Sequence, residues 1–80
     1  MSDSSNGRRK VAGYNQFVKL VRREKALKVY LASDADVFFT QGVKSELNGK
    51  NIPLETKYTS DDLASMVGVE VPTAVITETE

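Results

Sequence analysis

Two kinds of apolar pattern alternate along this chain, and the alternation restricts the possible folds more than any other feature of the sequence. Strand-type runs, rich in β-branched and aromatic residues, occur at residues 27–32, 52–59 and 73–77, with a candidate edge strand at 8–13. Helix-type segments lie between them at residues 14–25, 35–48 and 61–67. Helices that alternate with strands favour a sheet with a helical layer on each face. We therefore expect an α/β fold, a three-layer α/β/α sandwich around a central mixed sheet of about four strands.

The first helical segment has one apolar face and one polar face. Apolar side chains recur at the i, i+3, i+4 and i+7 positions of an amphipathic helix, namely Tyr14, Phe17, Val18 and Val21. The opposite flank carries Asn15, Gln16, Lys19, Arg22 and Arg23. Gly13 precedes the helix, and a residue without Cβ permits a tight turn or the close approach of another molecule.

Paired aspartates occur at the starts of the other two helical segments. The pairs are Asp34 with Asp36 and Asp61 with Asp62. Carboxylates accept hydrogen bonds from the free N–H groups of a first turn and interact favourably with the helix dipole. We therefore interpret both pairs as helix caps rather than as metal ligands. The second helix is expected to bury some of its apolar residues Val37, Phe38, Val43 and Leu47.

The residue types that are missing exclude most enzyme classes. The chain has no cysteine and no histidine, which removes disulfide scaffolds, thiolate metal sites, cysteine nucleophiles and the commonest general base. It also has no glycine-rich phosphate loop and no Ser/His/Asp set. A pair of carboxylates from distant residues is the one catalytic arrangement that the sequence leaves open. We expect a non-enzymatic protein without catalytic residues, cofactor or metal.

The length and the N-terminal sequence bear on organisation and location. Eighty residues with 40% hydrophobic content suit one domain over residues 1–80, with residues 1–7 as a disordered tail. The polar N-terminus lacks the apolar core of a secretory signal, and no apolar run reaches the roughly 18 to 20 residues that span a bilayer. We expect a monomer in the cytoplasm that does not contact membranes.

The formal net charge is zero, but it averages two regions of opposite sign. Residues 1–28 contain eight Lys or Arg and two acidic residues, a net charge of +6, whereas residues 29–80 contain three Lys and nine acidic residues, a net charge of −6. Because the electrostatic field follows local charge, the basic third can attract an anion. The alternative is a solvated, charge-balanced surface without a partner.

Two segments carry residue types that suit contact with nucleic acid. Asn15 and Gln16 each offer a hydrogen-bond donor and an acceptor, which suits reading a base edge, and Lys19 follows one turn later. The Val-Glu-Val-Pro loop at residues 69–72 has two valines that either close the core or contact a partner such as an unstacked base. Each segment also has an ordinary explanation. The helix residues are then solvated side chains near the start of the helix, and the two valines are part of the core.

Three segments in order resemble a known family. Residues 13–19 (GYNQFVK) look like its G-x-N-E-x-x-K motif, which is G-x-K-Q-x-x-K in bacteria. Residues 28–36 (KVYLASDAD) look like V-x-x-A-x-D-x-D, and residues 62–72 (DLASMVGVEVP) look like D-L-G-x-x-x-G-I-E-V-P. The chain thus resembles the kink-turn RNA-binding superfamily of ribosomal proteins L-seven-Ae and L-thirty-e, which includes small YbxF-like bacterial members.

The resemblance implies a non-enzymatic, ribosomal or ribosome-like protein that binds a kink-turn in a ribosomal RNA or an mRNA leader. A kink-turn is a sharply bent RNA built around tandem sheared G·A pairs. By this resemblance, Asn15 and Gln16 read the sheared guanines, Lys19 holds the same region, and the 69–71 loop packs on the flipped-out nucleotide. The full set of expected RNA-binding residues is Gly13, Tyr14, Asn15, Gln16, Lys19, Arg23, Val69, Glu70 and Val71.

A second function is compatible with the same fold. The −6 charge of residues 29–80 would repel a long nucleic acid, which favours a protein–protein interaction module that has lost RNA binding. The two hypotheses differ in whether the start of the first helix and the 69–71 loop respond to RNA.

Overall fold

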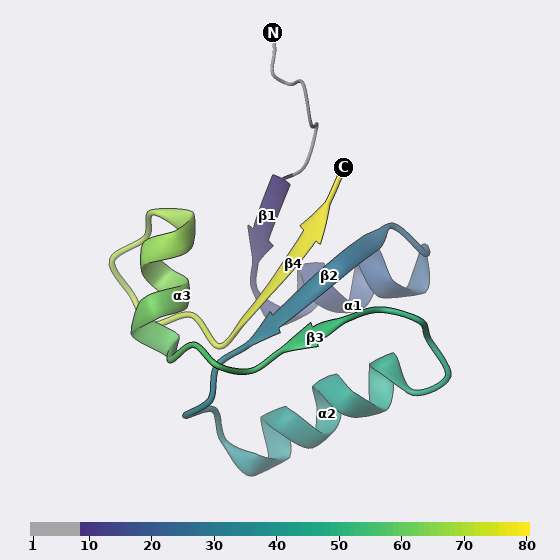
Figure 1. Cartoon of the computed structure of the whole chain (residues 1–80), viewed down its shortest axis with the longest axis horizontal. Coiled ribbons are helices and arrows are strands. Elements are labelled where there is room, and N and C mark those ends of the chain that lie inside the picture. The colour runs from purple at the N-terminus through teal and green to yellow at the C-terminus, as the bar shows by residue number, and fades with distance from the viewer. Residues whose placement is uncertain (1–8) are drawn as a thin grey trace, which may run out of the picture.

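The computed structural model describes residues 9–80, so the tail expected at residues 1–7 lies outside the described residues. The elements in chain order are β1 (Arg9–Ala12), α1 (Tyr14–Arg22), β2 (Ala26–Leu31), α2 (Val37–Leu47), β3 (Leu54–Glu55), α3 (Ser60–Val67) and β4 (Val75–Thr79). The strands form one sheet in the order β1-β4-β2-β3 (Figure 1). β4 is antiparallel to both of its neighbours, whereas β2 and β3 are parallel. The expectation of an α/β fold with a mixed four-stranded sheet is confirmed.

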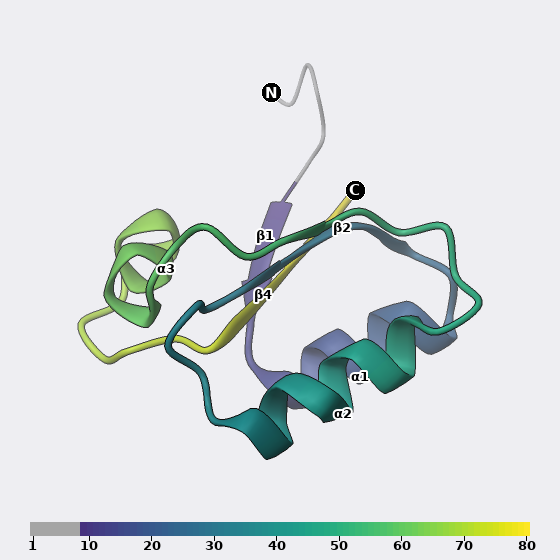
Figure 2. The same cartoon turned by 60° about the horizontal axis from the view of Figure 1, so that its bottom comes forward.

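The helices cover the two faces of the sheet unequally. α1 and α2 lie side by side under one face, while α3 packs on the other face at one end (Figures 1 and 2). The larger core, on the α1 and α2 side, contains the buried residues Phe17, Val21, Val29, Leu31, Val43, Leu47 and Val75. The smaller core, under α3, contains Tyr30, Ala32, Leu63 and Ile76. Neighbouring residues of β2 and β4 therefore alternate between the two cores, as the pleat of a strand requires.

α1 ends at Arg22, three residues before the predicted end at residue 25. Glu24 adopts a left-handed backbone conformation, with φ of 58°. Its N–H donates to the Val21 carbonyl at 3.0 Å, and the Lys25 N–H donates to the Leu20 carbonyl at 2.9 Å. This pair of hydrogen bonds is a Schellman motif, which usually has glycine at the left-handed position. With glutamate there, the sequence contains no stop signal for the helix.

Three of the four aspartates that were interpreted as caps hold the starts of α2 and α3 through hydrogen bonds. The Asp36 side chain accepts a hydrogen bond from the Phe38 N–H at 2.7 Å. Asp62 and Thr59 form a reciprocal capping box at the start of α3. Asp34 accepts from the Ser60 N–H at 3.0 Å and from the Ser60 hydroxyl at 3.1 Å, so it joins the turn before α2 to the start of α3.

The strand predicted at residues 52–59 is regular over only two residues, Leu54–Glu55. On either side of β3 the chain still follows β2, because the Val29 N–H donates to the Pro53 carbonyl at 3.0 Å and the Ser33 N–H donates to the Tyr58 carbonyl at 2.7 Å. Leu54 packs against the larger core and Tyr58 against the smaller one. Leu54 and Tyr58, four positions apart, thus contact opposite faces of the sheet, because the chain leaves the strand geometry between them.

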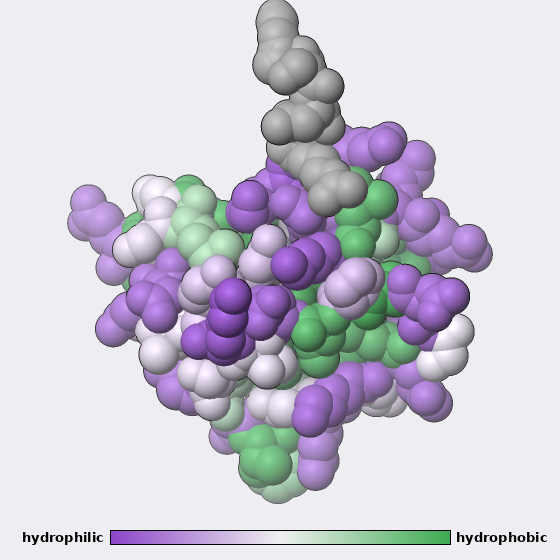
Figure 3. Space-filling view, viewed as in Figure 1, coloured by the Kyte–Doolittle hydropathy of each residue, from purple (hydrophilic) through white to green (hydrophobic). Residues whose placement is uncertain are grey.

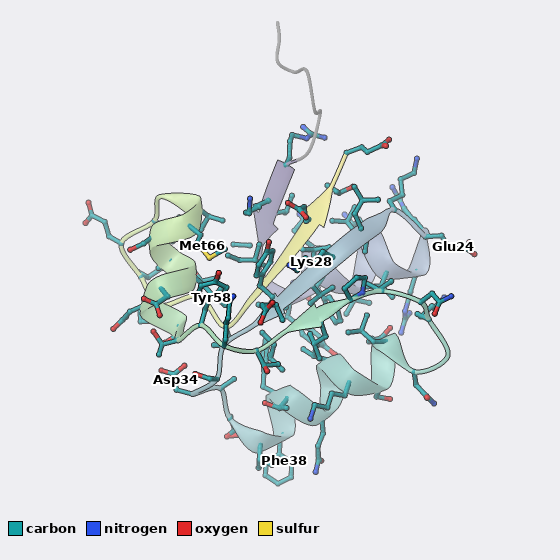
Figure 4. All side chains as sticks on the ribbon, in the orientation of Figure 1. Glu24, Lys28, Asp34, Phe38, Tyr58 and Met66 are labelled. Carbon is teal, nitrogen blue, oxygen red and sulfur yellow. The ribbon has the colours of Figure 1, made fainter. Side chains whose placement is uncertain are left out.

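The last strand extends beyond the predicted end at residue 77, to Thr79, and β4 lies in the interior of the sheet. Its polar residues Thr77, Glu78 and Thr79 are buried. The Thr79 hydroxyl donates to the Lys25 carbonyl at 2.8 Å, and the Glu78 carboxylate lies 3.6 Å from the Lys10 ammonium. A neighbouring ion pair joins Lys28 to Glu55 at 3.9 Å. It lies on the part of the sheet that α3 leaves uncovered, where Figure 4 labels Lys28.

Candidate nucleic-acid interface

One face of α1 carries the polar residues that the sequence singled out. A helix turns roughly 100° per residue, so Asn15, Lys19 and the C-cap residue Arg23 are each offset by about 40° from the one before. Gln16 completes a polar sector of roughly 100°. All four residues are exposed. The apolar face of the same helix buries Phe17 and Val21 in the larger core, which fixes the polar face toward solvent. We call Asn15, Gln16, Lys19 and Arg23 the α1 stripe.

Within residues 9–80, none of the α1 stripe side chains has a hydrogen bond or an ion pair that would occupy it. Arg22 differs from its neighbour Arg23. Its guanidinium donates to the Glu46 carboxylate of α2 at 3.1 Å. That hydrogen bond, together with the charge of Glu46, raises the pKa of Arg22. Arg22 is therefore committed to holding α1 against α2, whereas Arg23 is available to a ligand.

The N-terminus of α1 has no side-chain cap. Gly13 occupies the N-cap position with φ of 109°, and the first turn contains no acidic residue. α2 and α3, by contrast, are capped by Asp36 and by the Thr59 box. The first N–H groups of a helix carry partial positive charge and bind anions when nothing else satisfies them. The α1 N-terminus can therefore accept a phosphate close to the α1 stripe.

An apolar cleft joins the start of α1 to the loop before β4. Its volume is about 320 Å³. It is lined by Ala12, Gly13, Tyr14, Phe39, Val69, Val71, Pro72, Thr73, Ala74 and Val75. Val69 and Val71 are 41% and 66% exposed, so the loop does not close the core. The structure thus brings together the two segments that the sequence suggested separately.

Tyr14 forms a wall of this cleft rather than an extension of the α1 stripe. Its ring packs against Phe17 and Phe39, with centroid distances of 5.7 and 5.3 Å. A Cβ on Gly42 would lie 3.2 Å from the Tyr14 hydroxyl, so glycine within α2 makes room for this ring. Glu70 is exposed between the two valines.

Sequence reasoning missed Phe39, which contributes an aromatic wall from α2. The available signal was weak, because Val37-Phe38-Phe39 is a continuous apolar run at the start of a helix and the pattern does not show which ring faces inward. The described residues, 9–80, contain no group of three or more acidic side chains that could hold a metal ion. Over the same residues, every helix is too short or too polar to cross a bilayer.

The fold agrees with comparisons to known proteins. Residues 2–80 match the model of the Ribosomal protein L7Ae/L30e/S12e/Gadd45 family, and the chain belongs to this family. That assignment confirms the resemblance found in the sequence.

Individual relatives are similar over most of the chain. A protein named RNA-binding protein from Staphylococcus aureus strain Mu3 is 26% identical over 66 residues, which cover 82% of this chain and 79% of the relative. A structure titled Giardia lamblia 15.5kD RNA binding protein superposes with a TM-score of 0.79 at 28% identity, covering 89% of this chain and 60% of the other. A Bacillus halodurans protein of unknown function has a TM-score of 0.80 at 22% identity, covering 89% and 71%, and supports the fold alone.

Proposed function

We propose that this protein binds RNA that contains a kink-turn and catalyses no reaction on it. The observation that carries the proposal is the apolar cleft, which places Gly13 and Tyr14 at the start of α1 next to Val69 and Val71. Membership of the family supports it, as do the relatives that are named RNA-binding proteins.

The α1 stripe has the chemistry to read the sheared G·A pairs. In this proposal the amides of Asn15 and Gln16 exchange hydrogen bonds with guanine edges, and Lys19 donates to their carbonyl and N7 acceptors. Arg23, at the C-cap position of α1, contacts a phosphate. The uncapped N–H groups beside Gly13 provide a second position for a phosphate.

The cleft supplies the apolar part of the interface. A nucleotide flipped out of the bulge would rest against Val69 and Val71, since unstacked bases are commonly held on apolar and aromatic surfaces. The exposed Glu70 carboxylate can accept a hydrogen bond from an exocyclic amino group of a base.

The proposed mechanism is shape-selective. A free kink-turn exchanges between extended and bent forms, and a protein that binds the bent form better shifts the population toward it. In this proposal the protein acts as a monomer in the cytoplasm, on a ribosomal RNA or an mRNA leader, without a cofactor or a membrane.

A gel-shift experiment tests the proposal with two RNAs, a standard kink-turn and a variant in which the G·A pairs are replaced by Watson–Crick pairs. We expect clear preference for the kink-turn. Asn15→Ala and Lys19→Ala should each weaken binding by about 1–3 kcal/mol, as for good base contacts. Arg22→Ala is the matched control, because Arg22 is on the same helix but is paired with Glu46. Equal affinity for both RNAs would contradict the proposal.

The protein-interaction alternative is favoured by the acidic charge of residues 29–80. Chemical-shift titration with the kink-turn separates the two functions. Shifts that cluster on residues 13–23 and 69–71 support RNA binding. No response from a folded protein to any RNA supports the interaction module.

A further inference from the structure

The most exposed large apolar side chain among the described residues is Phe38, at 79%, and its neighbour Val37 is 61% exposed. Figure 4 shows Phe38 pointing away from the molecule at the start of α2, and in Figure 3 a hydrophobic group protrudes at that position. Burial of a phenylalanine ring contributes substantially to stability, so a solvent-exposed ring on a helix has no evident role in this fold.

The backbone at Phe38 is fixed by the cap of its own helix. The Phe38 N–H donates to the Asp36 carboxylate at 2.7 Å, which fixes the first turn of α2. The next residue, Phe39, points inward, and its ring lies 5.3 Å from that of Tyr14. The two phenylalanines therefore differ by one helical step of roughly 100°, with one ring in the cleft and the other outside it.

The size of the exposed ring indicates what covers it. A phenylalanine side chain offers on the order of 150–250 Å² of surface, whereas a stable protein–protein interface needs about 800 Å² from each partner. Val37 adds too little to close this gap. An area of this size instead matches the face of one nucleobase, and stacking on an aromatic side chain is a general way to hold an unpaired base.

The position of Phe38 is continuous with the proposed RNA interface. α1 and α2 begin at the same end of the molecule, where the loop before β4 also lies (Figures 1 and 2). Phe39, adjacent in the chain, lines the cleft together with Tyr14 and Val71. The start of α2 therefore borders the cleft.

We propose that Phe38 stacks on an unpaired nucleobase of the bound RNA, next to the nucleotide held in the cleft. This inference rests on the proposed function, because it requires that RNA occupies the cleft. It assigns Phe38 a contact outside the α1 stripe and outside the loop at residues 69–71.

The experiment uses the full chain and kink-turn RNAs that carry 2-aminopurine at one unpaired loop position at a time. 2-Aminopurine loses fluorescence when it stacks, so it reports the contact directly. We expect one position to be quenched by the wild-type protein and not by Phe38→Ala. The same variant should bind the unlabelled RNA about 5- to 150-fold more weakly, the range expected for the loss of one stacked base.

Two control variants make the result specific to the ring. Phe38→Trp retains an aromatic face and should retain both the quenching and the affinity. Val37→Ser removes an exposed apolar side chain beside it without removing a ring, and should bind like the wild type. Because Phe38 is exposed, circular dichroism should show unchanged folding for every variant.

The outcomes separate this inference from the function on which it rests. If the wild type prefers the kink-turn and Phe38→Ala binds and quenches equally well, stacking by Phe38 is wrong and the proposed function stands. If Phe38→Ala changes the sedimentation of the free protein but leaves RNA binding unchanged, stacking by Phe38 is also wrong. The partner of the ring is then a second copy of the protein. If the wild type does not distinguish the kink-turn from its variant, both proposals are overturned.

Discussion

Thr77 is the one buried side chain in residues 9–80 whose polar atom has no hydrogen-bond partner. By the alternation of β4, its side chain lies on the same face as Val75 of the larger core, where an unsatisfied polar group is unfavourable. Valine has the same shape without the hydroxyl. Thr77→Val should therefore raise the free energy of unfolding by about 1 kcal/mol, measured by urea denaturation.

Thr79 provides the matched control for this prediction, two residues along the same strand. Its hydroxyl donates to the Lys25 carbonyl at 2.8 Å, so Thr79→Val removes a hydrogen bond that is made. We expect Thr79→Val to lower the free energy of unfolding by about 0.5–1.5 kcal/mol. Equal effects of the two substitutions would show that the hydroxyl of Thr77 has a partner.

Glu24 has the left-handed backbone conformation that favours glycine, with φ of 58°. It is exposed, as Figure 4 shows, so its side chain contributes little to packing. Glu24→Gly should raise the free energy of unfolding by about 1 kcal/mol, because it relieves the clash between Cβ and the backbone. Thermal unfolding should then shift upward by about 4–8 °C. Glu24→Ala retains a Cβ and should show no such gain.

The residues of the candidate site were predictable to different degrees. The α1 stripe followed from helical periodicity, because the apolar residues at i, i+3, i+4 and i+7 force the intervening polar residues to face outward. The neighbourhood of Tyr14 and Val71 was not predictable from periodicity, since it depends on how β4 returns beside β1. The family resemblance, rather than the spacing of residues, connected the start of α1 with the loop at residues 69–72.

At the scale of elements, helix starts were predicted better than strands. The aspartates before α2 and at the start of α3 act locally, so residue type alone indicated their roles. Strands were predicted at the positions of β3 and β4, but their lengths were wrong because strand length depends on the neighbouring strand. Pro53 has no N–H to donate, and β4 continues to Thr79 because β1 and β2 pair with it on both sides.

The contact between Asp34 and Ser60 gives a prediction at this scale. Asp34 accepts two hydrogen bonds from Ser60, across 26 positions in the sequence. Asp34→Ala should lower the free energy of unfolding by about 1–2 kcal/mol, because it removes bonds that join two elements. Asp61→Ala removes only a first-turn charge near the helix dipole and should cost less than about 1 kcal/mol. Chemical denaturation of both variants makes the comparison.

At the scale of the whole molecule, the separation of charge should govern how RNA binding depends on salt. Lys19 and Arg23 belong to the region with a net charge of +6, whereas most of the remaining chain is acidic. Each phosphate that a cation neutralises releases counterions, which makes affinity fall with salt concentration. We expect binding to the kink-turn to weaken steadily from low to physiological salt.

A single cation can be tested in the same titration. Arg23→Ala should reduce the slope of log affinity against log salt by about 0.7–0.9 if Arg23 contacts one phosphate. Lys44→Ala is the control, because Lys44 lies on α2 beside a separate hollow lined by Thr40 and Thr56. An equal change for both variants would show that only the overall charge matters.

The walls of the cleft come from three distant stretches of the chain: residues 12–14, Phe39 and residues 69–75. The last of these stretches begins 55 positions after the first one ends. A chain still emerging during synthesis therefore contains the residues of the α1 stripe long before it contains the opposite wall of the cleft. A ligand that needs both sides can therefore be recognised only after residues 69–75 have been synthesised and folded against the start of α1.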